Sequence, residues 1–82
     1  MEKKSLLELE QIVDNATDAI EYKLVVASLI SMIGKLSFNS RYDLINVLES
    51  LLRDFNSKMT IETARRKSKA AITAVSMALQ YN

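Results

Sequence analysis

Apolar residues recur at spacings of three and four along most of the chain, which is the period of one face of an α-helix. The first such run follows Ser5, which forms a capping-box pattern with Glu8. The pattern turns polar over residues 14–18 and then resumes. One bent helix over 5–35 and two helices separated there both fit this pattern. The first stripe consists of Leu6, Leu9, Val13, Ala16 and Ile20.

A second helical segment, residues 18–36, is apolar around most of its circumference, with either Asn15 or Thr17 as its cap. Such a helix is buried on more than one side. Gly34 is placed where a left-handed cap would end it. Its main stripe consists of Tyr22, Val26, Leu29, Ile30, Ile33 and Leu36, with Leu24, Val25 and Met32 partly outside.

Two further helices follow, over about 41–55 with Ser40 as its cap and over about 60–80 with Thr60 as its cap. The third has a stripe of leucines ending at Phe55. The inner face predicted for the fourth consists of Ile61, Ala64, Ser68, Ala71, Ile72, Val75, Ala78 and Leu79. We therefore expect one all-α domain over 1–82, a small three- or four-helix bundle with helices at about 5–16, 18–36, 41–55 and 60–80.

The composition of the 82 residues narrows the chemistry, because the chain contains no His, no Cys, no Pro and one Gly. This removes disulfides, the usual zinc sites, the usual general base and glycine-rich phosphate loops. We expect no enzyme, no cofactor and no metal site. Asp14, Asp18 and Glu21 would share a face if the helix continued through Thr17. A solvated face, or one that docks the basic fourth helix of a sister chain, explains them better than a metal does.

The number of apolar residues, compared with the surface that a domain of this size can bury, predicts a homodimer. Apolar residues make up 49% of the chain, about 40 residues, yet a domain of this size buries only about 60–65% of the surface of its unfolded chain. The second segment is also too apolar on all sides for a lone three-helix layer. A second copy of the chain would cover the excess.

The net charge of +1 hides an asymmetry between the two ends of the chain. Residues 1–55 carry six basic and nine acidic side chains, whereas residues 56–82 carry five basic side chains and Glu62. Arg65, Arg66 and Lys69 would share one side of the fourth helix and could contact phosphates of a nucleic acid. We favour a solvated or acid-paired face, with Glu62 as a local partner, because a short basic run is a weak motif for phosphate binding. We expect Arg66 and Lys69 to be exposed.

The longest apolar run, Leu24 to Ile33, has ten residues, about half of what a membrane span needs. The N-terminal residues lack the continuous apolar core of a signal peptide. We expect a soluble, cytoplasmic protein that does not bind a membrane.

From Leu24 onward, an apolar helix is followed by a helix patterned Asn39-x-Arg41-x-x-Leu44-Ile45-x-x-Leu48-x-x-Leu51 and by a last helix that opens with Arg66-Lys67. This order resembles the small enterobacterial YmgB/AriR biofilm and acid-resistance regulators. The resemblance implies a short helical dimer that acts as a non-enzymatic connector, with DNA binding proposed for that family. The chain departs from the family at the junction of the third and fourth helices and in its first helix.

These observations favour a small helical regulator or adaptor that acts as a dimer through protein–protein interaction. The alternatives are a nucleic-acid-binding transcriptional regulator, with Arg65, Arg66 and Lys69 as contacts, and an accessory protein of a virus or plasmid.

Overall fold

The computed structural model describes residues 5–55 and 58–81. Over these ranges the chain forms helices and no strand, which confirms the predicted all-α class. The elements are α1 (Leu6–Asn15), α2 (Ala19–Met32), the short 3-10 helix η1 (Ile33–Lys35), α3 (Phe38–Asp54) and α4 (Ile61–Tyr81).

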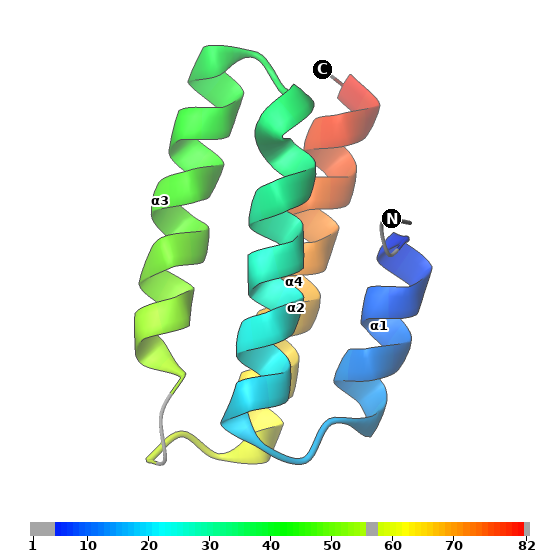
Figure 1. Ribbon diagram of the computed structural model, residues 1–82, viewed down its shortest axis with the longest axis vertical. Coiled ribbons are helices and arrows are strands. Elements are labelled where there is room, and N and C mark those ends of the chain that lie inside the picture. Colours follow the sequence, from blue (N-terminus) through cyan, green and yellow to red (C-terminus); the bar gives the residue numbers. More distant parts are fainter. Residues whose placement is uncertain (1–4, 56–57, 82) are drawn as a thin grey trace.

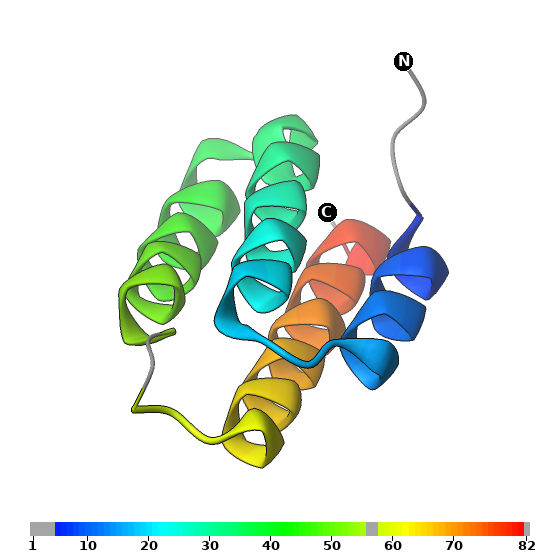
Figure 2. The ribbon, with the colours of Figure 1, turned by 60° about the horizontal axis from the view of Figure 1, so that its bottom comes forward.

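The helix α2 occupies the middle of the bundle. In Figure 1 it runs in front of α4, with α3 on one side and α1 on the other. Figure 2 shows the same arrangement turned by 60° about the horizontal axis, with α4 seen alongside α2 and α1. Because α1, α3 and α4 all contact α2, three of its sides are covered and the fourth faces outward.

The core is built from all four helices. Tyr22 and Phe55 are its two largest fully buried side chains, and their ring centroids lie 5.9 Å apart where α2 begins and α3 ends. Ser68 is the buried polar residue of this core, at the centre of the inner face of α4. The buried apolar residues are Leu9, Val13, Ala16, Tyr22, Val25, Val26, Leu29, Ile33, Leu36, Leu48, Leu51, Phe55, Ala64, Ala71, Ile72 and Val75.

The helix α1 begins with the predicted capping box. The Ser5 hydroxyl accepts a hydrogen bond from the backbone N–H of Glu8 at 3.2 Å, and the Glu8 carboxylate accepts one from the backbone N–H of Ser5 at 3.5 Å. The chain leaves the helix at Ala16, whose backbone is extended at φ −69° and ψ 143°. Residues 5–35 are therefore two helices, and the alternative of one bent helix is wrong.

The second helix is capped by Asp18 rather than by Asn15 or Thr17. The Asp18 carboxylate accepts a hydrogen bond from the backbone N–H of Glu21 at 3.0 Å, and the Asp18 backbone is extended. Aspartate is among the strongest N-caps, because its carboxylate satisfies free N–H groups and interacts favourably with the helix dipole. The new start changes the register, so Ile20 is exposed instead of continuing the stripe of α1.

The connection between α2 and α3 spans residues 33–37, whereas the sequence predicts it at residues 37–40. Residues 33–35 form the 3-10 turn, and no residue among those described has a positive φ, so the left-handed cap expected at Gly34 is absent there. A 3-10 turn provides partners for terminal carbonyls without a left-handed residue. Ser37, not Ser40, precedes the first turn of α3, and its carbonyl accepts from the N–H of Arg41 at 2.9 Å. The Arg41 guanidinium also donates to the Gly34 carbonyl at 3.3 Å, which ties the two helices together.

The start of α4 agrees with the prediction. The hydroxyl of Thr60 accepts a hydrogen bond from the N–H of Thr63 at 3.1 Å, and its carbonyl accepts from the N–H of Ala64 at 3.0 Å. Most of the predicted inner face is buried or partly buried, whereas Ile61 and Leu79 at its two ends are exposed. The apolar pattern therefore predicted the orientation of this helix.

Candidate interaction surfaces

The basic cluster of α4 is divided among three directions. Arg65 and Lys69 reach α1, Lys67 reaches α3, and Arg66 lies on an exposed side of α4. A helix turns by about 100° per residue, so neighbouring side chains separate quickly around its axis. The three cations of the predicted binding face therefore have different surroundings.

Arg65 caps the C-terminal end of α1. Its Nε donates to the carbonyl of Val13 at 3.4 Å, and its Nη2 donates to the carbonyl of Ala16 at 3.5 Å. The last turn of α1 contains no basic residue of its own, so Arg65 supplies the positive charge that the negative end of the helix dipole favours. Tyr22 donates to the same Ala16 carbonyl at 3.1 Å. The junction of α1 and α2 is thus held to α4 by a partly buried arginine.

Lys69 forms an ion pair with Asp14 of α1, with 2.6 Å between Nζ and Oδ1. Both side chains are about half exposed, at 50% and 52%. Lys69 is therefore exposed, as expected, yet it has an acidic partner within its own chain. Lys67 lies 4.0 Å from Asp54 of α3, a looser pair. The acidic surface expected to meet the fourth helix of a sister chain is met, at Asp14, by the fourth helix of the same chain.

Arg66 keeps the exposure that the sequence predicts. Within the described residues it has neither an ion pair nor a hydrogen bond, and the pairing expected between Glu62 and the two arginines does not occur there. By contrast, the ion pairs that Lys67 and Lys69 form with aspartates at exposed positions each contribute only about 0.2–1 kcal/mol to the stability of the fold. In this arrangement Arg66 is the member of the cluster best placed to meet a ligand.

The acidic row Asp14, Asp18 and Glu21 does not form one face, because the helix is interrupted between Asn15 and Ala19. Asp18 caps α2, and Asp14 is paired with Lys69. Among the described residues, no group of three or more acidic side chains could hold a metal ion. None of the described helices is long and apolar enough to cross a membrane.

The outward side of α2 forms an apolar strip, which we call the α2 strip: Ile20, Leu24, Ala27 and Ser31. All four residues are exposed, Ile20 at 67% and Leu24 at 62%. They follow each other at spacings of four, three and four, so they lie within one narrow sector of the helix. The sequence indicated that α2 is apolar all round but did not identify this side. Recognising Asp18 as the cap would have moved Ile20 onto α2.

A second surface lies between α1 and α4, where exposed apolar side chains stand among the polar residues Glu10, Thr73, Ser76 and Gln80. The cleft there has a volume of about 320 Å³ and includes Leu7, exposed at 64%, and Met77, exposed at 54%. Ile72 forms its floor, because this side chain is buried in the core. The α2 strip is not part of this cleft, so the described residues expose large apolar side chains on two separate sides of the bundle.

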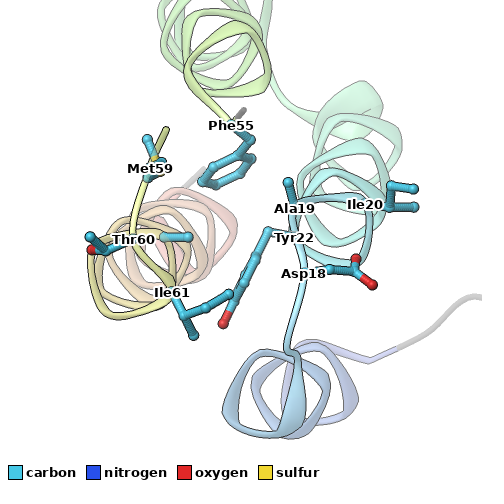
Figure 3. A pocket seen from close by; sticks show the side chains of 9 residues that line it. Asp18, Ala19, Ile20, Tyr22, Phe55, Met59, Thr60 and Ile61 are labelled. Carbon is cyan, nitrogen blue, oxygen red and sulfur yellow. The ribbon is translucent and has the colours of Figure 1, made fainter. Parts of the chain in front are cut away.

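A larger pocket of about 610 Å³ opens at the end of the bundle where α2 begins, α3 ends and α4 begins. Figure 3 shows the rings of Tyr22 and Phe55 and the side chain of Ile61 directed into it, whereas Asp18 and Ile20 point away. The hydroxyl of Tyr22 and the carboxylate of Asp18 already have backbone partners. Among the described residues that line it, the pocket is an apolar hollow without the converging polar groups that an active site needs.

Comparisons with known proteins do not identify the chain: no family model, no curated protein and no solved structure matches it. The resemblance to the YmgB/AriR regulators therefore stays a prediction, and function has to be argued from the surfaces of the molecule.

Proposed function

We propose that this protein is a non-enzymatic regulator or adaptor that forms a dimer and binds another protein through its helix faces. One observation carries the proposal: the described structure exposes large apolar side chains at two separate places, Ile20 and Leu24 on the α2 strip and Leu7 and Met77 at the cleft between α1 and α4. Single exposed apolar side chains are common on monomers and need no explanation. Two surfaces, each with a large side chain more than 60% exposed, suit a dimer with one further partner.

The energetic argument rests on apolar area. Covering exposed apolar surface contributes about 25 cal/mol per Å², and a fully covered leucine or isoleucine contributes about 1.5–3 kcal/mol. Ile20 and Leu24 stand on adjacent turns of α2, so one partner helix would cover both. Because these side chains are exposed to water in the isolated chain, the contact with a partner would stabilise the complex by burying them.

The contacts of the basic cluster favour a protein partner over a nucleic acid. Phosphate binding depends on several free cations, and each one neutralised adds about one unit to the slope of log affinity against log salt. Arg65 is engaged with carbonyls of α1, and Lys69 with Asp14. A nucleic acid would have to displace these partners or bind through Arg66 with little help.

Affinity capture tests the proposal. The chain is immobilised and exposed to nuclease-treated extract of its host, in parallel with the variant Met77→Glu and the control Asn46→Glu. Asn46 is exposed on α3, away from both apolar surfaces, so the control adds the same charge without touching them. We expect a defined protein to be retained by wild type and by the control, and lost with Met77→Glu. Equal retention on all three baits would contradict a role of the cleft in partner binding.

Two further measurements address the other parts of the proposal. Sedimentation at micromolar concentration should give a dimer, and a monomer there would contradict the dimeric state. A mobility-shift titration at low salt should show no shift of duplex DNA or of RNA. A shift that weakens with salt, and weakens further for Arg66→Ala, would instead support the nucleic-acid-binding alternative.

A further inference from the structure

The α2 strip has an uneven distribution of side-chain size. Its two large residues, Ile20 and Leu24, stand in the first half of the helix, and its two small ones, Ala27 and Ser31, stand in the second half. None of the four is charged. The strip is thus a ridge at one end and a shallow groove at the other.

Two-fold symmetry would fit this ridge to this groove. If a second α2 lay antiparallel, with the symmetry axis crossing the strip midway between Leu24 and Ala27, each residue would face the partner's residue at the same distance on the other side of the axis. Ile20 would then face Ser31 of the partner subunit, and Leu24 would face Ala27 of the partner subunit. Both pairs place a large side chain over a small one, which lets helices approach closely. A C2 interface requires such self-complementarity.

The size of the face also suits a second copy. Figure 1 looks down the shortest axis of the molecule, and α2 runs through the middle of the face it shows. The extents of the molecule across this face are 34 × 24 Å, so the face has room for an interface of standard size. A standard stable interface buries about 800 Å² on each partner. The strip alone, about 16 Å long from Ile20 to Ser31, would form the centre of such an interface.

We propose that a second copy of this chain docks on the α2 strip, with the two α2 helices antiparallel across a two-fold axis. This inference rests on the proposed dimeric function and adds the site and the geometry of self-association. A parallel arrangement would set Ile20 on Ile20 of the partner subunit and Ser31 on Ser31 of the partner subunit. The ridges would then collide at one end while the grooves left a gap at the other.

The first experiment measures self-association of Leu24→Asp by sedimentation over a concentration series. We expect the dissociation constant to rise at least about tenfold, because the carboxylate would be buried without a partner in the interface. The matched control is Val47→Asp, which alters an apolar residue of α3 exposed at 58%. This control should dimerise like wild type. Far-UV circular dichroism of both variants verifies that the helices are retained.

The second experiment tests the antiparallel geometry. Because the chain contains no native cysteine, only the introduced cysteines can form disulfides. Chains carrying Ile20→Cys are mixed with chains carrying Ser31→Cys under mild oxidation. We expect the mixed disulfide to form at least about tenfold faster than the Ile20→Cys homodimer. Antiparallel helices would hold the two copies of residue 20 about 16 Å apart along the axis, beyond the roughly 7 Å that a disulfide can bridge.

The outcomes separate this inference from the proposed function. A wild-type chain that stays monomeric contradicts the dimeric function itself. A wild-type dimer that Leu24→Asp leaves intact contradicts the α2 site and keeps the dimeric function. Faster cross-linking of Ile20→Cys with itself than with Ser31→Cys contradicts the antiparallel geometry. Loss of dimer with Leu24→Asp together with the mixed disulfide supports both the site and the geometry.

Discussion

The helices α2 and α4 pack against each other, yet their remaining sides differ in character. The cations of α4 are exposed on its surface or reach neighbouring helices, as Arg65 and Lys69 reach α1. The outward side of α2 carries the uncharged α2 strip. Many polar residues mark the solvent side of α4 in the sequence, whereas the outward side of α2 has only Lys23 and Ser31 as exposed polar residues beside Ile20, Leu24 and Ala27. An all-round apolar helix shows that burial is needed but leaves its direction open.

The largest difference in the free energy of unfolding is expected between substitutions on the two sides of α2. Leu29 is fully buried and Leu24 is exposed at 62%, five residues apart on the same helix. Leu29→Ala should lower the free energy of unfolding by about 2–5 kcal/mol, since it leaves a cavity in the core. Leu24→Ala should change it by less than about 0.5 kcal/mol in dilute, monomeric protein. Urea unfolding followed by circular dichroism measures both, and equal losses would show that the α2 strip is covered within one chain.

The next effect separates two neighbours on α4. Arg65→Met removes the donors to the carbonyls of Val13 and Ala16 and should reduce stability by about 1–2 kcal/mol, because those acceptors lose a charged partner. Arg66→Met, at an exposed position, should stay within about 0.5 kcal/mol. Hydrogen exchange of the amides at the junction of α1 and α2 should accelerate only in the first variant. Similar losses in both variants would mean that the cap on α1 has no energetic role.

A smaller effect of opposite sign is expected where α4 faces the core. The hydroxyl of Ser68 is buried, and the described structure offers it no hydrogen-bond partner. Ser68→Ala removes an unsatisfied polar group and improves helix propensity, so the free energy of unfolding should rise by about 1 kcal/mol. Ser28→Ala is the matched control on α2, because the Ser28 hydroxyl already donates to the carbonyl of Leu24 at 3.0 Å and lies nearer the surface. Thermal unfolding measures both, and destabilisation by Ser68→Ala would reveal a partner for this hydroxyl.

The smallest effect concerns the ion pair of Lys69 with Asp14. A double-mutant cycle to alanine should give a coupling energy of about 0.2–1 kcal/mol, as expected for half-exposed side chains. The coupling should largely vanish in 1 M salt, because the Debye length falls to about 3 Å. The same cycle on Lys67 and Asp54, at 4.0 Å, should give a lower value. A coupling that is larger and insensitive to salt would mean that the Lys69 pair is shielded from solvent.

Much of the fold could be predicted from local patterns. The capping box at Ser5, the cap at Thr60 and the leucine stripe of α3 each depend on residues within a few positions of one another. Hydropathy then predicted which side of α3 and of α4 faces the core. Such features can be predicted from the sequence because they depend on neighbouring residues and not on distant parts of the chain.

The features that could not be predicted depend on competition or on distance. Asp18, Asn15 and Thr17 are all acceptable N-cap residues. Asp18 is the one that caps α2, and this start of the helix leaves Ile20 exposed. Gly34 suits a left-handed cap, but a 3-10 turn and the reach of Arg41 to its carbonyl closed the connection instead. The contacts of the candidate site were the hardest to predict from the sequence, because Arg65 and Lys69 contact residues that lie about 50 positions earlier in the chain.

The separation between Arg65 and Val13, 52 residues, has a consequence for the order in which the newly made chain assembles. Ribosomes add about 5–20 residues per second, so α1 leaves the synthesis site about 3 to 10 seconds before the arginine that caps it. A ten-residue helix is shorter than the roughly 12–15 residues that an isolated helix needs in water. The adjacent helices α2 and α3 can pair during that interval. Among the four helices, α1 is therefore made before α4, and the contacts of α1 with Arg65 and Lys69 can form only after α4 has been synthesised.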